Sequence, residues 1–389
     1  MVKQGAAMVR PRLRFPEFGG EPWDSKSLKE IAPLQRGFDL PSSEVQPGSV
    51  PVFYSNGVQR FHNVGMVSAP GLMTGRSGTI GKLHFIENGE YWPHNTSLWV
   101  TSFKGNVAKF VYFLFDAIGM GRFSSGSGVP TMNRNDVHAH ISAVPRSLAE
   151  QQKIADCVTS LDEVIAAQGR KVEALKAHKR GLMQQLFPRE GKTRPRLRFP
   201  EFHDAPEWRY MLLRELEDKK LVQLGRGDVI SHDDMRANPG LNPVYSSSVI
   251  NQGLMGTYGE YMFDEELISW SIDGGGHFFH RPKHKFSVTN VSGFMRVLSN
   301  EVICSFLALQ LQQLHASQKF DYQQKAHPSV IRALYSVGLP DPREQQRIAN
   351  CLSSLDTQIT AESNQLTALK THKQGLMQQL FPAPDAATA

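Results

Sequence analysis

The sequence predicts an α+β protein in which two mixed α/β blocks alternate with two long helices. The helices are expected to form an antiparallel coiled coil with internal pseudo-twofold symmetry. Three observations support this fold class: an internal duplication, two apolar stripes with coiled-coil spacing, and two strand-rich stretches between them. A chain of 389 residues is long enough for two or three domains, each with its own core.

The duplication consists of near-identical segments at the ends of two dissimilar blocks. Residues 10–18 and 194–202 both read RPRLRFPEF, 184 positions apart. Segments 150–155 (EQQKIA) and 344–349 (EQQRIA) are 194 positions apart, and GLMQQLFP occurs at 181–188 and 375–382. Each half is therefore a variable block between near-constant ends, as expected of a protein that does one mechanical job twice against two targets.

The two stripes predict the long helices. Their apolar residues recur in steps of three and four, which is typical of a coiled coil. The stripes are Ile154, Val158, Leu161, Ile165, Val172, Leu175, Leu182 and Leu186, and then Ile348, Leu352, Leu355, Ile359, Leu366, Leu369, Leu376 and Leu380. Phe-Pro follows each stripe, which predicts two helices of roughly 55 Å. Each stripe needs a partner: its twin or, alternatively, its own domain.

Four polar residues within the stripes, Gln168, Lys179, Glu362 and Lys373, predict the register. Parallel helices would bury Lys179 against Lys373, with nothing to offset the like charges. An antiparallel pair can instead place Lys179 against Glu362 and Gln168 against Lys373. The apolar layers then pair Leu161 with Leu380, Ile165 with Leu376, Val172 with Leu369, Leu175 with Leu366, Leu182 with Ile359, and Leu186 with Leu355. Sliding by one heptad would set each lysine against an apolar residue, so this register is preferred.

The blocks between the helices, residues 20–148 and 203–342, are rich in Gly, Ser, Asn and aromatic residues. Short β-like runs occur at 51–54, 83–86, 97–101, 267–272 and 294–298, and each block has one helix late in its span, at 107–118 and 302–314. The predicted boundaries are a first domain at 1–148, a first helix at 149–187, a linker at 188–193, a second domain at 194–342, a second helix at 343–381 and a tail at 382–389.

Three near-motifs for catalysis or metal binding do not fit. GRSGTIGK at 75–82 resembles a phosphate-binding loop, but its glycines are one residue too far apart and Leu83 replaces the required hydroxyl. Asn-Pro-Val-Tyr at 242–245 lacks the second proline of the amino-methyltransferase loop. His277, His280 and His284 have a possible metal spacing, but their basic neighbours favour a loop facing phosphate. No catalytic residue, metal or cofactor is therefore assigned to this chain.

Charge and loop composition indicate a polyanionic partner. The formal charge is +6 and the pI is about 9.1. The loops carry side chains that pair with base edges and phosphates. The candidates in the first block are Arg36, Tyr54, Ser55, Asn56, Arg60, Arg76, Thr79, Lys82, His94, Asn95, Arg122, Ser125, Ser127, Asn133 and Arg134. Those in the second block are Arg226, Tyr245, Ser246, Ser247, His277, His280, Arg281, Lys283, Lys285, Gln323, Gln324, Lys325 and His327. Any solvated loop contains such residues, so the assignment is stronger for each block than for each residue.

One geometric expectation concerns the basic residues of the second block. Arg281, Lys283 and Lys285 are predicted to lie on the same face as residues 245–247, opposite the helix at 302–314.

The cysteines and the apolar stretches bear on the compartment. Cys157, Cys304 and Cys351 are too few and too scattered for a disulfide scaffold or a zinc site. The first ten residues lack the apolar core of a secretory signal, and the most apolar stretch, at 110–115, is too short to span a bilayer. We therefore expect reduced thiols, a cytoplasmic protein and no membrane partner.

The duplicated motifs together resemble a known family. The helical blocks open with AEQQKIA and REQQRIA and close with GLMQQLF, and LRFPEF leads to Trp23 and to Trp208. This arrangement, over essentially the whole chain, resembles the specificity subunit of a type I restriction–modification system. GTIGK at 78–82 and VPTMN at 129–133 also resemble pieces that recur in its target-recognition domains. The second block departs from both, with DGGG at 273–276 and KAHPS at 325–329.

The resemblance implies a non-catalytic subunit with two target-recognition domains. Each would read one half of a bipartite, asymmetric double-stranded DNA sequence through the major groove. The helices would set the unread spacer and dock two methyltransferase subunits, and restriction endonuclease subunits would join the complex. S-adenosylmethionine, ATP and magnesium would belong to those partners. Two alternatives are the DNA-recognition subunit of a type IIB-like enzyme and a two-headed coiled-coil scaffold that binds proteins without a DNA role.

Overall fold

The computed structural model describes residues 11–20, 23–126, 129–273, 277–316 and 325–382. Three expected DNA contacts, Ser127, Gln323 and Gln324, lie outside these ranges, as do residues 383–389 of the expected tail. The chain divides into two compact units, Met1–Arg170 with Ser363–Ala389, and Lys171–Glu362. Each unit contains one strand-rich block and a part of each long helix.

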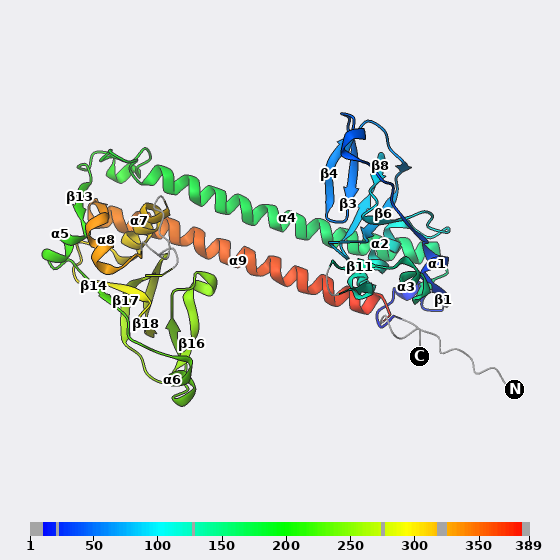
Figure 1. Cartoon of the computed structure of the whole chain (residues 1–389). Coiled ribbons are helices and arrows are strands. Elements are labelled where there is room, and N and C mark those ends of the chain that lie inside the picture. Colours follow the sequence, from blue (N-terminus) through cyan, green and yellow to red (C-terminus); the bar gives the residue numbers. More distant parts are fainter. Residues whose placement is uncertain (1–10, 21–22, 127–128, 274–276, 317–324, 383–389) are drawn as a thin grey trace. The chain divides into compact units, whose positions relative to one another are not determined.

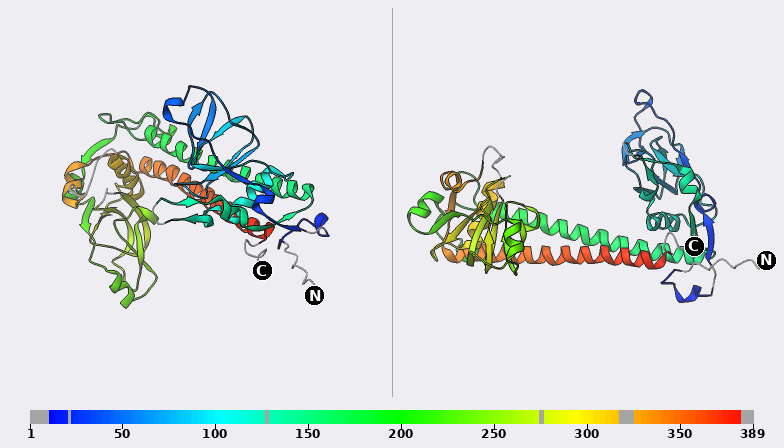
Figure 2. Two further views of the ribbon diagram at one scale, coloured as in Figure 1. Left: turned by 45° about the vertical axis from the view of Figure 1, so that its right-hand side comes forward. Right: turned by 60° about the horizontal axis from the view of Figure 1, so that its bottom comes forward.

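The two predicted long helices are confirmed as α4 (Leu148–Leu186) and α9 (Pro342–Leu380), each of 39 residues. Within each unit they lie side by side (Figures 1 and 2). In the second unit Lys171 contacts Glu362 and Lys179 contacts Asp356, so residue numbers rise along α4 and fall along α9. The predicted antiparallel pairing is therefore correct.

The predicted register is wrong. The Nζ of Lys179 lies 2.6 Å from Asp356, and the Nζ of Lys373 lies 2.6 Å from Asp162. Both aspartates are almost one heptad from the predicted partners, Glu362 and Gln168. The prediction assumed that a lysine in the apolar seam needs a polar residue directly opposite. Instead, the aliphatic part of each lysine covers the seam while its ammonium group reaches an acid at the rim, where the aspartates are 49% and 40% exposed.

The first unit contains twelve strands and three short helices besides its parts of α4 and α9, within the described residues. The strands are β1 (Trp23–Ser27), β2 (Leu34–Arg36), β3 (Val50–Tyr54), β4 (Gly57–His62), β5 (Val67–Ser68), β6 (Gly71–Gly75), β7 (Leu83–Ile86), β8 (Glu90–Pro93), β9 (Ser97–Val100), β10 (Ser124–Ser125), β11 (Thr131–Met132) and β12 (Ile141–Pro145). The helices are α1 (Leu28–Ile31), α2 (Ala108–Ile118) and α3 (Arg134–Ala139).

The first block contains two four-stranded sheets, in the orders β2-β9-β6-β7 and β4-β3-β8-β5, and the two-stranded pairs β1-β12 and β10-β11. The α2 helix packs on β6 and β7 and ends at Gly119, whose positive φ of 74° suits a left-handed cap. The core joins Trp23 and Phe110 to Val158 of α4 and Phe381 beyond α9. The helix parts are thus built into the core of the unit.

The second unit has the same plan with a longer sheet. Its strands are β13 (Arg209–Leu212), β14 (Val222–Arg226), β15 (Asn242–Tyr245), β16 (Leu254–Tyr258), β17 (Phe263–Ser271), β18 (Phe278–Val288), β19 (Ser292–Val297) and β20 (Ser336–Leu339). Its shorter helices are α5 (Leu213–Asp218), α6 (His232–Ala237), α7 (Cys304–Ala316) and α8 (Pro328–Leu334). The sheet order is β14-β19-β17-β18-β15-β16, and α7 packs on β17 and β18. The five predicted β-like runs overlap β3, β7, β9, β17 and β19. Most ends agree within one or two residues, but β17 begins at Phe263, four residues before the predicted run.

The duplicated sequence makes the same Arg–Glu ion pair in both units. In the first unit Arg14 binds the Glu150 carboxylate through two bonds of 2.7 Å, and the Trp23 indole donates to it at 3.1 Å. In the second unit Arg198 binds Glu344 through bonds of 2.7 and 2.6 Å. The RFPEF segment therefore supplies the arginine, and the EQQ segment supplies the glutamate, of an ion pair that attaches each block to a long helix.

The glutamine that follows each of these glutamates connects the long helix to a shorter helix of the same block. Gln151 accepts from the Val107 amide at 2.9 Å, and Gln345 accepts from the Ile303 amide at 2.9 Å. These contacts lie at the starts of α2 and α7. We call the Arg14–Glu150 pair with Gln151 the first junction, and the Arg198–Glu344 pair with Gln345 the second junction.

Candidate nucleic-acid interface

In the first unit, the turns that follow β3, β6 and β8 bring several expected DNA-contacting residues together. We call these turns, residues 54–57, 76–82 and 94–97, the first loop cluster. The Tyr54 ring stacks on the His94 ring, with centroids 3.9 Å apart and planes tilted by 26°. Burial lowers the pKa of His94, which favours a neutral ring in this stack.

Thr96 and Lys82 hold the turns of this cluster together. The Thr96 hydroxyl accepts from the Ser55 amide at 3.3 Å, and the Thr96 carbonyl accepts from the Arg76 amide at 2.8 Å. The Lys82 ammonium donates to the Asn56 carbonyl at 3.0 Å. The sequence therefore builds one connected polar surface from loops far apart in the chain.

An Arg-Gly pair at the end of β2 borders the same cluster. Arg36 contacts Asp39 at 3.2 Å, and the Asn95 amide also donates to Asp39. A Cβ at Gly37 would lie 2.2 Å from the His94 carbonyl oxygen, so only glycine permits this backbone approach. The approach places Arg36 beside the 94–97 turn.

The other expected residues of the first unit lie on neighbouring elements. They are Arg60 on β4, Thr79 in the 76–82 turn, Arg122 in the 3-10 helix Met120–Phe123, Ser125 on β10, Asn133 as the N-cap of α3, and Arg134 at its first position. Backbone bonds connect β11 to the cluster: the Met132 amide donates to the Arg76 carbonyl at 2.8 Å. Arg60 is engaged locally, donating to Ser42 at 2.7 Å.

In the second unit, Arg281 lies beneath the corresponding loops and contacts Tyr245 and Gln252. Its guanidinium lies 3.6 Å from the Tyr245 ring centroid. It donates to the Ser269 hydroxyl at 2.9 Å and to the Gln252 carbonyl at 2.6 Å. Only 2% of Arg281 is exposed, and burial lowers its pKa to about 10, so it stays charged at neutral pH. Its visible role is to hold the 246–253 loop against the sheet.

That loop has an unusual backbone. Asn251, Gln252 and Gly253 have φ values of 50°, 53° and 83°. Two consecutive non-glycine residues in the left-handed region are uncommon and need support from their surroundings. Support comes from Arg281 and from the Ser246 amide, which donates to the Gly253 carbonyl at 2.8 Å. We call residues 245–253 with residues 289–292 the second loop cluster.

The second loop cluster repeats the Arg-Gly feature of the first. Arg226 donates to the Asn290 carbonyl, and a Cβ at Gly227 would lie 2.2 Å from the Val288 carbonyl oxygen. Thr289 donates to Ser246 at 3.0 Å. The Ser246–Thr289 hydrogen bond thus occupies the position of the Tyr54–His94 stack in the first unit.

The remaining expected residues of the second unit are distributed over several elements. They are Ser247 in the 246–253 loop, His277 before β18, His280, Lys283 and Lys285 on β18, Lys325 paired with Asp273 at 2.8 Å, and His327 as the N-cap of α8. The structure does not gather His277, His280 and His284 into one site: His277 lies beside Gln312, His280 binds Glu266, and His284 contacts Tyr245.

Two expectations about this segment are wrong. Residues 278–288 form strand β18 rather than a basic loop. Arg281 lies against Tyr245 on the side of the sheet away from α7, as expected, but the predicted common face does not extend to Lys285. The rings of His284 and Phe286 both contact Tyr245, so Lys285 between them points the other way, where its ammonium lies over Tyr261.

The physical reason is an irregularity in the pairing of β17 with β18. Arg281 pairs with Leu267 and His284 pairs with Glu265, so β18 has one extra residue beside Pro282. Such a bulge reverses the alternation of side chains beyond it. A period-two pattern read through residues 281–285 therefore gives the wrong face.

The sequence did not predict several residues in or beside the two clusters: Asp39, which contacts Arg36 and Asn95, and Thr96, Gln252, Thr289 and Asn290. A signal for some of them was present. Arg-Gly occurs at 36–37 and 226–227, and Asn-x-Ser occurs at 95–97 and 290–292. Aligning the two variable blocks on these short motifs would have identified the shared turn, although not the contacts of Gln252.

The comparisons with known proteins agree with this organisation. The family model described as the type I restriction modification DNA specificity domain matches residues 213–371, which contain most of the second variable block and most of α9. Residues 213–371 therefore contain a type I restriction modification DNA specificity domain. The family resemblance predicted from the duplicated motifs is confirmed.

Similar proteins occur in Mycoplasma pneumoniae. One putative type I specificity subunit is 30% identical over 142 residues, covering 36% of this chain and 58% of that protein. Another is 30% identical over 195 residues, covering 46% of this chain and 53% of that protein. The chain therefore spans little more than half the length of these relatives.

Solved structures share the fold across nearly the whole chain. The crystal structure of a type I restriction–modification S subunit from M. genitalium has a TM-score of 0.68 and 14% identity, covering 96% of this chain and 99% of that one. A chain from a study of the assembly and conformational transition of a type I system has a TM-score of 0.54 and 13% identity, covering 93% and 98%. The predicted α+β fold with two blocks and two long helices is thus confirmed.

Among the described residues, none of the helices combines the length and apolar character required to cross a membrane.

Proposed function

We propose that this chain is a non-catalytic subunit that recognises a bipartite, asymmetric double-stranded DNA sequence. Each unit reads one half of the target through its loop cluster, and α4 with α9 sets the unread spacer. The helices also dock two methyltransferase subunits, and restriction endonuclease subunits bind the assembled complex. The main support is the match of residues 213–371 to the specificity domain. The first unit repeats the junction of the second unit, which supports the same role for both.

The chemistry of the loop clusters supports DNA as the ligand. Arg36 and Arg226 end equivalent strands, next to glycines that allow two backbones to approach closely. Around them lie Asn95, Ser55 and Ser247, whose side chains can pair with base edges or phosphates. Base contacts would differ between the units because Tyr54 and His94 are replaced by Ser246 and Thr289.

The buried Arg281 supports the reading role without touching DNA itself. Its two donated bonds and its stacking on Tyr245 fix the 246–253 loop. Ser247 and the exposed Ile250, 77% accessible, lie on that loop. A loop held in one conformation loses less conformational entropy on binding, which favours discrimination between sequences.

The direct test uses the full chain and a library of random duplexes. Bound duplexes should be enriched in two short sequences at a fixed separation, and retention should fall steeply with added salt because phosphate contacts release counterions. Enrichment of one short sequence alone would contradict the bipartite proposal. Absence of retention even at about 50 mM salt would favour a protein-binding scaffold instead.

A further inference from the structure

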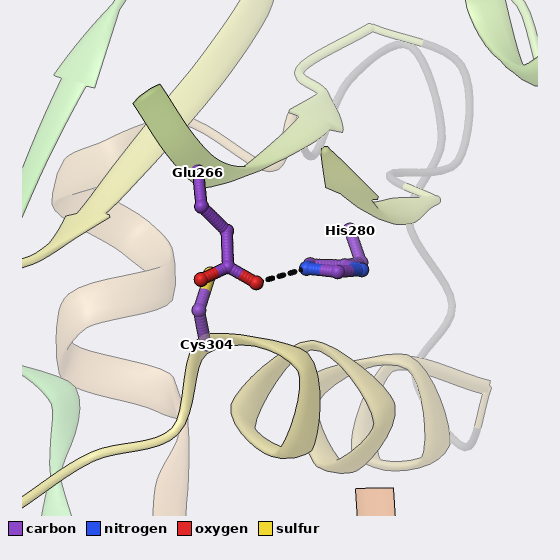
Figure 3. Close-up of side chains that lie close together, drawn as sticks. All are labelled: Glu266, His280 and Cys304. Carbon is purple, nitrogen blue, oxygen red and sulfur yellow. Dashed lines mark hydrogen bonds and ion pairs between the residues drawn. The ribbon is translucent and has the colours of Figure 1, made fainter. Parts of the chain in front are cut away.

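One cluster of side chains in the second unit lies outside both loop clusters, although it includes His280, which is among the DNA contacts expected from the sequence. Glu266 of β17, His280 of β18 and Cys304 at the start of α7 converge on the side of the sheet that α7 covers (Figure 3). Their ligand atoms all lie within 4.8 Å of one another, and the His280 Nε2 lies 2.6 Å from the Glu266 Oε1. From this geometry we propose that Glu266, His280 and Cys304 form a binding site for a transition-metal ion of the zinc class.

The donor set selects the kind of metal. A thiolate, an imidazole and a carboxylate are the ligands that Zn²⁺ takes in tetrahedral sites, whereas Mg²⁺ and Ca²⁺ require oxygen donors. Zinc-to-ligand distances of about 2.0–2.3 Å require neighbouring donor atoms to be roughly 3.3–3.6 Å apart. The His280–Glu266 contact must therefore widen slightly, and the side chains are 33% and 47% exposed, which leaves them room to rotate.

Three protein ligands leave a fourth position for water or another small ligand. The exposed edges of Glu266 and His280 are where solvent can supply it. Cys304 is only 5% exposed, and burial together with the nearby Glu266 raises the pKa of its thiol. Metal binding must therefore displace a proton from Cys304, and the displaced proton goes to solvent.

The first unit shows that the shared architecture does not require this thiol. Gln151 binds the Val107 amide and Gln345 binds the Ile303 amide, so Ala108 and Cys304 begin equivalent helices. An alanine at the first position of α2 supports the same junction. Cys304 packs in the core of the second unit, and the alanine of the first unit makes Cys304→Ala a conservative test of the thiol.

The site would join three elements of the second unit: β17, β18 and the start of α7. A bound ion would stabilise this unit against local unfolding because it binds the folded arrangement in preference to the unfolded chain. This inference does not depend on DNA recognition and assigns the ion no catalytic step.

The experiment is a titration of the full metal-free chain with Co²⁺, followed by displacement with Zn²⁺. We expect one equivalent of Co²⁺ per chain to give thiolate-to-cobalt charge-transfer absorption, which Zn²⁺ abolishes. Cys304→Ala and His280→Ala should each remove the absorption, while Cys351→Ser and His178→Ala, matched changes outside the cluster, should leave it intact. The proposal is overturned if the parent chain shows no such absorption at excess Co²⁺, or if either cluster variant retains it.

A second measurement covers the possibility that a variant folds poorly. Hydrogen exchange of residues 263–316 should slow when Zn²⁺ is added to the parent chain and remain unchanged in Glu266→Gln. Equal slowing in the parent chain and in Glu266→Gln would place the bound ion elsewhere and overturn the assignment.

Discussion

The two units use the same junction to hold different surfaces. Arg14 and Glu150 in the first unit correspond to Arg198 and Glu344 in the second, with bond lengths that agree within 0.1 Å. The strand orders also correspond: β2-β9-β6 matches β14-β19-β17, and the parallel pair of β3 with β8 matches that of β15 with β18. The architecture is therefore repeated even where the sequence is not.

The differences are concentrated in the loop clusters. The Tyr54–His94 stack of the first unit becomes the Ser246–Thr289 hydrogen bond in the second. A buried arginine, Arg281, fixes the loop of the second cluster. The same fold therefore presents two chemically distinct surfaces, as two half-sites of an asymmetric target would require.

The largest expected effect comes from breaking a junction. Glu344→Ala should destabilise the second unit by about 3–5 kcal/mol. The buried Arg198 guanidinium loses its carboxylate partner and keeps the carbonyls of Ala205 and Pro206, which carry no compensating charge. Glu150→Ala should do the same to the first unit. Unit-resolved hydrogen exchange would show which unit loosens.

The matched control is Arg209→Ala, which breaks an exposed contact of 3.7 Å with Glu301. Its cost should be about 0–1 kcal/mol. If Glu344→Ala costs no more than this control, the junction does not hold the unit together.

Arg281→Ala should give the next largest effect, about 1–3 kcal/mol, because it leaves the Ser269 hydroxyl and the Gln252 carbonyl without their donor. Exchange should accelerate in residues 246–254, and discrimination at one DNA half-site should weaken. Lys283→Ala, a change at an exposed position of the same strand, should only lower affinity for all sequences and reduce the salt slope by about one phosphate equivalent. Identical outcomes for the two variants would remove the distinction between a loop-fixing and a phosphate-binding residue.

The helix register can be tested by a smaller effect, of about 0.5–1 kcal/mol. Lys179→Asp should destabilise the second unit, and Asp356→Lys should restore the lost stability in the double variant. Rescue by Glu362→Lys in place of Asp356→Lys would instead support the register predicted from the sequence. Thermal unfolding of the single and double variants provides the measurement.

The smallest expected effect is a difference between the two units in how their stability depends on pH. The Leu34 amide donates to the His138 Nε2 at 2.8 Å, whereas the equivalent Leu224 amide donates to Glu217 at 3.1 Å. Burial lowers the pKa of His138, so His138 is protonated more readily in the unfolded chain than in the folded one. The first unit therefore loses stability as the pH falls below about 6.5.

Hydrogen exchange of β2 and α3 should therefore accelerate between about pH 7.5 and about pH 5.5, while that of β14 and α8 should change less. His138→Gln should remove the difference. A parent chain whose two units respond equally to pH would contradict this assignment.

The elements with strong periodicity were predictable from the sequence. The heptad-spaced stripes predicted α4 and α9, and the polar residues within the stripes predicted the antiparallel pairing. Five β-like runs coincide at least in part with strands. The register was not predictable because Lys179 and Lys373 can reach acids on either side of the seam. Side-chain length, which the heptad pattern ignores, decides between the alternatives.

The candidate interface was less predictable for a related reason. Residue type identified Arg36, Tyr54 and His94, which the structure brings together, but it could not distinguish an exposed arginine from the buried Arg281. The bulge beside Pro282 then changed the face of Lys285. Burial and bulges depend on pairing between distant segments, which a local pattern does not contain.

The most direct test of separate reading by the two units is an exchange of residues 203–342 for those of a related subunit. The hybrid chain would be co-expressed with its methyltransferase and the methylated sequence determined across the host genome. If each unit reads its own half-site, one half of the methylated motif should change while the other half and its orientation stay the same. A change in both halves, or in neither, would contradict it.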